Sequence, residues 1–152
     1  MTERIRARGS SPREVLDKLG LHPGQAVRVV GQGDRPLLAR VRARIRRRLA
    51  GKAPPAELIL FWPRAAFEIT EDLRSLRESI LAEGVIWVVT PKKGCRGSNG
   101  MPYLNQADLI PLGLAAGLVD NKTCSLSGKE SAMRFVLRKR DRSRAPGDRR
   151  LG

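Results

Sequence analysis

The arginines of this chain are the residues whose type and spacing most clearly indicate a chemical role, the binding of anions. Between residues 35 and 50, apolar side chains recur at the spacing of one helix face, at Leu37, Leu38, Val41, Ile45 and Leu49. The rest of the helix circumference carries guanidinium groups, those of Arg40, Arg42, Arg44, Arg46 and Arg47. Guanidinium groups pair well with phosphate and carboxylate oxygens. The spacing therefore predicts a helix over 35–50 that packs one face on the protein and offers these arginines to a polyanion.

Gly31, Gly33 and Asp34 form a second candidate site, because they follow a predicted strand and precede the arginine-rich helix. Glycine-rich turns that open a helix in this way bind phosphate groups and nucleotides. The sequence contains only GxG and lacks the third glycine of the dinucleotide fingerprint. A tight turn without a ligand is the alternative interpretation.

The segment 91–104 is a third candidate, since it combines glycine residues with cationic side chains. Lys92, Lys93 and Arg96 could hold an anion, and Tyr103 could stack on a base beside them. A flexible basic connector explains the same composition, so both interpretations stay open.

Residues for other kinds of chemistry are scarce. His22 is the only histidine, and the two cysteines, Cys95 and Cys124, lack the CxxC spacing of a zinc site. We therefore predict no catalytic residue, no metal and no cofactor.

The charge balance points to an anionic partner. The 152 residues include 30 Lys and Arg against 15 Asp and Glu, which gives a net charge of +15. Segments 1–13, 35–52 and 134–150 hold 20 of the 30 basic residues. Clustered charge of one sign is typical of proteins that bind polyanions, although codon drift and solubility are the alternative explanation.

Apolar runs are shorter than the roughly 18 residues of a membrane span, and the first residues lack a signal-peptide core. We expect a cytoplasmic protein without membrane contact.

The elements that must position these residues alternate between helices and strands. Apolar periodicity and turn residues predict helices at 12–19, 35–50, 70–82 and a fourth ending before Gly117, and strands at 26–30, 57–62, 85–90, 118–125 and 132–139. Such alternation predicts one α/β domain at 11–139 between flexible basic tails at 1–10 and 140–152. The expected fold is a small doubly wound, mostly parallel, five-stranded Rossmann-like sheet. Its crossovers should be right-handed, with helices on both faces, and its last two strands should form an antiparallel hairpin.

Four segments resemble a bacterial family of uncharacterised proteins, catalogued as domain of unknown function 3052. They are LGLHPGQAVRVVG (19–31), ELILFW (57–62), LAEGVIWVVTPKK (81–93) and AAGLVDNKTCSLSGKESAMRFVLRK (115–139). The resemblance implies a fold but no activity. The order of elements is also similar to the later half of class I methyltransferases. That similarity implies that the strand which supplies the ribose-binding acid of those enzymes is missing here, because a single helix separates the first two strands.

These observations favour a non-catalytic Rossmann-like domain that binds nucleic acid, RNA or DNA, or another polyanion through the arginine-rich helix and the tails. One alternative is a degenerate methyltransferase-like or nucleotide-binding enzyme, with the cofactor at Gly31, Gly33 and Asp34 and the substrate at Lys92 and Lys93. A further alternative is a module that docks an acidic protein.

Overall fold

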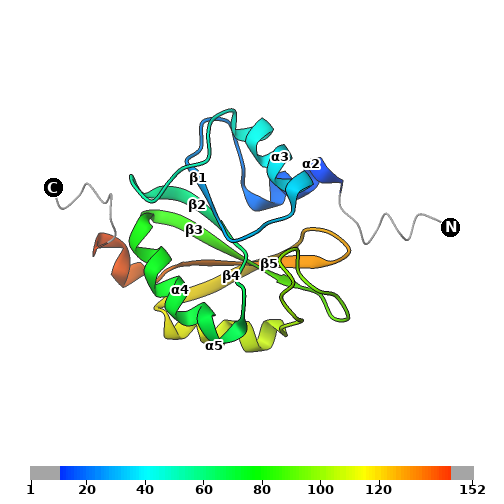
Figure 1. The fold of residues 1–152 in the computed structure, drawn as a ribbon. Coiled ribbons are helices and arrows are strands. Elements are labelled where there is room, and N and C mark those ends of the chain that lie inside the picture. The colour runs from blue at the N-terminus through cyan, green and yellow to red at the C-terminus, as the bar shows by residue number, and fades with distance from the viewer. Residues whose placement is uncertain (1–10, 145–152) are drawn as a thin grey trace.

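A computed structural model describes residues 11–144, which fold around one mixed five-stranded sheet (Figure 1). The strand order is β1-β2-β3-β5-β4, in which β1, β2 and β3 are parallel and β5 runs antiparallel to both of its neighbours. The strands are β1 (Val27–Val30), β2 (Ala56–Phe61), β3 (Ile80–Pro91), β4 (Leu118–Ser125) and β5 (Glu130–Leu137). The predicted α/β class, the mostly parallel sheet and the closing hairpin are confirmed.

Helices cover both faces of this sheet. The α-helices are α2 (Pro12–Leu19), α3 (Arg35–Ile45), α4 (Ile69–Leu76) and α5 (Gln106–Ala115), and the short 3-10 helices are η1 (Ala66–Glu68), η2 (Arg77–Ser79) and η3 (Lys139–Arg144). Figure 1 shows α2 and α3 above the sheet and α4 and α5 below it.

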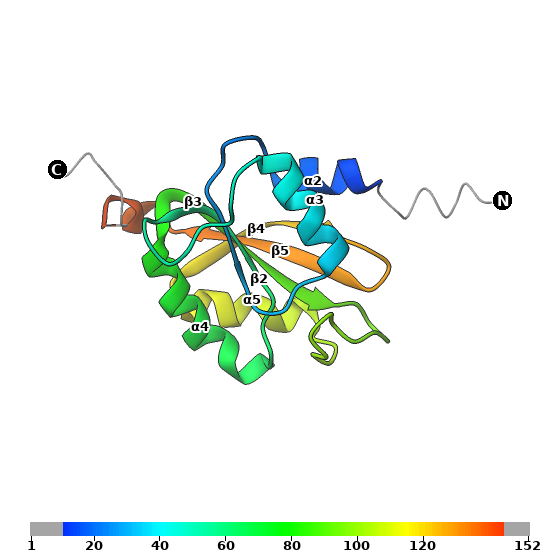
Figure 2. The ribbon, with the colours of Figure 1, turned by 45° about the horizontal axis from the view of Figure 1, so that its top comes forward.

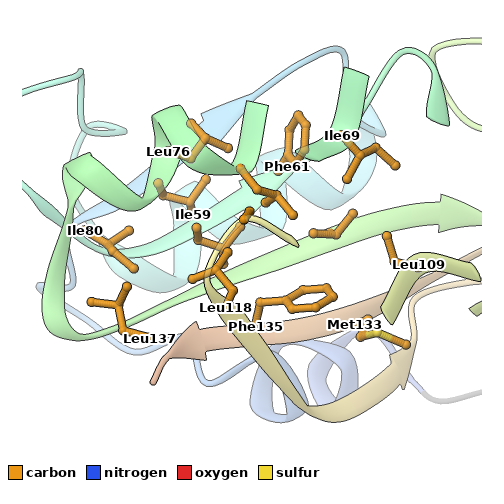
Figure 3. Close-up of a cluster of buried hydrophobic side chains, with 14 of the residues drawn as sticks. Ile59, Phe61, Ile69, Leu76, Ile80, Leu109, Leu118, Met133, Phe135 and Leu137 are labelled. Atoms are coloured by element: carbon orange, nitrogen blue, oxygen red, sulfur yellow. The ribbon is translucent and has the colours of Figure 1, made fainter. Parts of the chain in front are cut away.

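Alternating side chains of the central strands build a separate core on each face. In β2 and the residue after it, Leu58, Leu60 and Trp62 pack under α2 and α3, whereas Ile59 and Phe61 pack against α4 and α5. Figure 3 shows the second of these cores, in which β2, β4 and β5 meet the two helices. Because β2 is buried on both faces, its sequence is apolar without interruption from Leu58 to Phe61, as is typical of central parallel strands.

The connections between the parallel strands do not share one hand. β1, β2 and β3 follow one another across the sheet in one direction, yet α3 packs on one face and α4 on the other. Two successive crossovers that advance in one direction on opposite faces must have opposite hands. In the two views of Figures 1 and 2, the left-handed one runs through α3. The expectation of right-handed crossovers, which holds for about 98% of such units, is therefore wrong for β1–α3–β2.

The first helix begins where its sequence predicts. The Ser11 hydroxyl accepts the Glu14 N–H at 3.1 Å, and the Glu14 carboxylate accepts the Ser11 N–H at 2.8 Å. This capping box satisfies two backbone donors at the start of α2. At the other end, Gly20 adopts φ +80° and closes the helix in the left-handed conformation that glycine tolerates best.

The arginine-rich helix is shorter than predicted. It ends at Ile45 instead of residue 50, because Arg46 adopts a left-handed conformation (φ 57°). The Arg46 N–H still donates to the Arg42 carbonyl at 3.0 Å, after which the chain leaves the helix axis. Arg46 and Arg47 therefore belong to the turn after α3 and not to its exposed face.

A second helix boundary differs from the prediction. The segment predicted as a helix over 70–82 leaves α4 at Leu76, and Ile80 already pairs with Ala56 as the first residue of β3.

The fourth α-helix contains a proline. Asn105 caps α5, so Pro111 lies inside this helix. Pro111 lacks an N–H, so α5 loses one backbone hydrogen bond at this point.

The described part of the C-terminal segment is packed on the sheet. Asp141 lies 3.9 Å from Arg77, and Arg142 lies 3.7 Å from Glu83, which belongs to β3. The predicted tail 1–10 and the rest of the other tail, 145–152, lie outside the described residues. Within residues 11–144, no helix is long and apolar enough to cross a membrane.

Candidate functional site

A polar cleft of about 740 Å³ lies at the carboxyl edge of the parallel strands. One wall is the turn after β1 and the start of α3, including Gly31, Gly33, Asp34 and Arg35. The opposite wall comes from the loop after β3 and the β4–β5 turn, and it includes Arg96, Gly97, Ser98, Ser127, Lys129 and Glu130. Open α/β sheets bind their ligands at this edge. The cleft is therefore the candidate site.

The glycines of the first wall are required by a close approach to Trp62. Gly31 has φ +92°, and a Cβ at this position would overlap the Trp62 carbonyl oxygen. A Cβ on Gly33 would lie 2.9 Å from the Trp62 ring. The GxG sequence thus lets the turn lie directly on the indole, which is a structural reason for both glycines.

Glu130 joins the two segments of the second wall to each other and to Trp62, which lies beneath the glycine turn. It is only 4% exposed, and its carboxylate accepts the Ser98 N–H at 2.8 Å and the Ser98 hydroxyl at 2.9 Å. The Trp62 Nε1–H donates to the same carboxylate at 3.4 Å. One buried acid therefore connects the end of β2, the loop after β3 and the start of β5.

Asn99 fixes the same loop from its other side. Its side-chain amide donates to the Pro63 carbonyl at 2.8 Å, and its side-chain oxygen accepts the Met101 N–H at 3.2 Å. These two contacts hold the loop after β3 in place at the cleft, where its composition had left a binding loop and a flexible connector both open.

Cationic side chains outnumber acidic ones around the cleft. Arg35, Arg96 and Lys129 line it, and Arg96 also donates to the Gly100 carbonyl at 3.0 Å. The acids are Asp34, whose carboxylate caps α3 by accepting the Leu37 N–H at 3.1 Å, and the buried Glu130. Both carboxylates already accept hydrogen bonds from the protein, and three cations against two acids leave the lining with a net positive charge.

The predicted loop residues do not gather at one place. Arg96 lines the cleft, but Lys92, Lys93 and Tyr103 line a separate hollow of about 330 Å³ with Ser131. The Lys92 ammonium donates to the Ser125 hydroxyl at 2.7 Å, which draws it towards β4. The glycine turn and Lys92–Lys93 therefore line separate hollows, and a substrate at these lysines stays a prediction.

The five predicted arginines divide into two groups. The Arg44 guanidinium donates to the Asp17 carboxylate at 2.9 Å and to the Leu21 carbonyl at 3.0 Å, and Arg47 donates to the Gly24 carbonyl at 2.8 Å. These two side chains fasten α3 and its following turn to the segment 17–24. The side chains of Arg40, Arg42 and Arg46 are exposed, and their guanidinium groups make no hydrogen bond or ion pair with other described residues.

Sequence reasoning missed the residues that hold the site together. Trp62 ends the strand predicted at 57–62, but its contacts with the glycine turn and with Glu130 were not predicted. Nothing in the sequence marks Glu130 and Ser98 as site residues, because a single acid before a strand and a serine in a glycine-rich loop are common at protein surfaces. Among residues 11–144, no cluster of three or more His, Cys, Asp or Glu side chains could hold a metal ion.

Comparison with known proteins identifies the fold but no family. No protein-family model matches the chain, so the resemblance to domain of unknown function 3052 is unsupported, and no curated protein matches either. Solved structures do match. A SAM-dependent methyltransferase from Aquifex aeolicus is 14% identical with a TM-score of 0.60, over 82% of this chain and 88% of that one. A putative methyltransferase from Thermoplasma acidophilum is 9% identical with a TM-score of 0.58, over 86% and 76% of the two chains. The CcbJ methyltransferase from Streptomyces caelestis is 10% identical with a TM-score of 0.55, over 83% and 88%. The chain thus has the Rossmann-like fold of class I methyltransferases.

Proposed function

We propose that this chain is a degenerate methyltransferase-like domain that binds a small anionic, nucleotide-like ligand in the cleft. The observation that carries the proposal is the cleft itself, where the glycine turn and the N-terminus of α3 face Arg96 and Lys129 across a ligand-sized space. The guanidinium and ammonium groups around this space favour phosphate or carboxylate groups, with which they form charge-assisted hydrogen bonds.

S-adenosylmethionine is the cofactor that the names of the structural neighbours suggest, and the residues of this chain do not fit it. β1 is the edge strand of the sheet, so no strand lies beside it to supply an acid for the ribose. The acids that line the cleft, Asp34 and Glu130, already cap α3 and hold the Ser98 loop. Trp62, which is 1% exposed, fills the space beneath Gly33. We therefore derive no methyl-transfer step.

The ligand would lie outside Trp62, between Arg35 and Lys129. Both side chains are exposed and make no hydrogen bond or ion pair within the described residues, so their charges are available. A phosphate held by both would form charge-assisted hydrogen bonds, each contributing about 1.5–3 kcal/mol. We expect phosphate-bearing ligands to bind more tightly than uncharged nucleosides.

Isothermal titration calorimetry would test this proposal with AMP, ATP, adenosine and S-adenosylmethionine. The double variant Arg35→Gln/Lys129→Gln should weaken nucleotide binding about tenfold or more, from the loss of charged contacts of this size. The matched control Lys93→Gln removes an exposed cation outside the cleft and should bind as the wild type does.

Two results would overturn the proposal. Nucleotide binding that is equal in the wild type and in Arg35→Gln/Lys129→Gln would place the ligand elsewhere. Tight binding of S-adenosylmethionine, with no preference for phosphate over adenosine, would show that a methyltransferase cofactor site is intact.

A further inference from the structure

Four exposed arginines lie on α3 and the turn that follows it. This arginine surface consists of Arg40, Arg42, Arg46 and Arg48, whose exposed guanidinium groups make no hydrogen bond or ion pair with other described residues. None of them lines the cleft. The arginine surface is therefore separate from the proposed ligand site.

The support beneath this surface is rigid. Val41 and Ile45 are fully buried under α3, and the guanidinium of Arg44 holds the helix to Asp17 at 2.9 Å. Arg47 fixes the following turn to the Gly24 carbonyl. The backbone that presents the exposed arginines is therefore fixed before any partner binds. Mutual repulsion between the unpaired charges costs stability, which a partner with negative charge would relieve.

The neighbouring exposed side chains indicate which kind of partner fits. Between the arginines, the outward positions of α3 are Pro36, Ala39 and Ala43. Protein interfaces are usually anchored by buried aromatic or large aliphatic side chains, and this surface has none. It also has no aromatic residue on which a base could stack. A surface of arginine and alanine is suited to hydrated phosphates along a chain.

We propose that the arginine surface binds the phosphate backbone of nucleic acid, without reading its sequence. The helix rises about 1.5 Å per residue, so Arg40 to Arg46 span roughly 9 Å of the axis before the reach of the side chains is added. Arg40 and Arg42 flank the outward face of α3, roughly 160° apart at 3.6 residues per turn, and Arg46 follows in the turn. Consecutive phosphates of one strand would be held from both flanks. Four contacts to a single strand correspond to a salt slope of about −2.8 in log K against log salt, and two contacts to about −1.4.

Fluorescence anisotropy with a labelled oligothymidylate would test this, with salt varied between about 50 and 200 mM. Other basic segments of the full chain contribute to the wild-type slope, so the difference between variants is the measurement. Arg42→Gln/Arg46→Gln should make the slope shallower by about 1.4. The salt-dependent loss attributed to this surface would fall from about 50-fold to about 7-fold over this range. Arg40→Gln/Arg48→Gln should make the slope shallower by a similar amount. Agreement between the two double variants would show that the change does not come from misfolding of one of them.

Lys93→Gln/Lys139→Gln is the matched control, because it removes two exposed charges from other elements. Its slope should stay within about 0.5 of the wild type if contacts and not net charge decide the effect. Equal slopes in the arginine variants and the control would overturn the proposal, as would absence of binding by the wild type. Equally tight binding of polyglutamate would also overturn it, in favour of an acidic protein partner.

Discussion

Replacement of Glu130 by glutamine tests whether this buried carboxylate holds the cleft together. The substitution keeps the shape of the side chain but changes one acceptor oxygen into an –NH₂ donor. One carboxylate oxygen faces the Trp62 Nε1–H and the Ser98 hydroxyl, and the other faces the Ser98 N–H. The Ser98 hydroxyl can rotate to accept, but neither N–H can. Either orientation of the amide therefore leaves one N–H donor facing another donor.

The cost follows from the burial of this group. A buried donor left without an acceptor costs about 1–3 kcal/mol, and loss of the negative charge weakens the remaining bonds. We expect Glu130→Gln to lower the free energy of unfolding by about 2 kcal/mol. For a folded domain of this size that corresponds to a fall in Tm of roughly 7 °C.

Thermal and urea unfolding followed by circular dichroism would measure the effect, with hydrogen exchange at the Ser98 amide as the local measurement. Ser98→Ala removes only the hydroxyl contact of an exposed side chain, so it should cost about 1 kcal/mol or less. The double variant should be less destabilised than the sum of the single changes, because the two groups interact directly. A Glu130→Gln protein within 0.5 kcal/mol of the wild type (roughly the lower limit for one hydrogen bond) would refute the role assigned to Glu130.

Three further predictions concern single positions. Gly31→Ala should destabilise the fold by about 1–3 kcal/mol, since a Cβ would overlap the Trp62 carbonyl and φ is positive; chemical denaturation that leaves the midpoint unchanged would contradict this. The hydrogen bond from the Ser11 backbone N–H lowers the pKa of Glu14, so the ionised carboxylate stabilises the fold above the pKa of the unfolded chain. The Tm difference between wild type and Glu14→Gln should therefore be largest near neutral pH and vanish as the pH falls below about 4.5 and through the folded pKa. Burial raises the pKa of the Cys124 thiol, so less of it is thiolate at pH 8. Iodoacetamide should therefore alkylate Cys124 more slowly than it alkylates the thiol of free glutathione, as followed by mass spectrometry. Equal alkylation rates for the two thiols would contradict this.

The fold was predictable where local pattern and tertiary structure agree. The uninterrupted apolar run around Ile59 and Leu60 predicts a strand buried on both faces, and that is where β2 lies. Ser11 and Glu14 predict the start of α2 because a capping box involves only neighbouring residues. The end of α3 was not predictable, since no glycine marks the left-handed residue there and Arg46 takes that conformation instead.

The candidate site was predictable only in its local part. Gly31 and Gly33 were identified from their place between a strand and a helix, and they do line the cleft. The contacts of Glu130 were not, because they join residues 32 and 68 positions away in the chain. Such contacts depend on which strands become neighbours, and no local pattern specifies that.

The left-handed connection through α3 has a consequence for the order in which this protein assembles. Strand twist favours right-handed units, so it does not direct α3 to the face of the sheet on which it packs. If β2, β3, β5 and β4 are already paired, Leu58, Leu60 and Trp62 offer α3 an apolar surface on that face. The β1–α3 segment should therefore dock last and detach first. In native-state hydrogen exchange, the amides of β1 would open at lower free energy than those of β3, as a separate cooperative unit at the edge of the sheet.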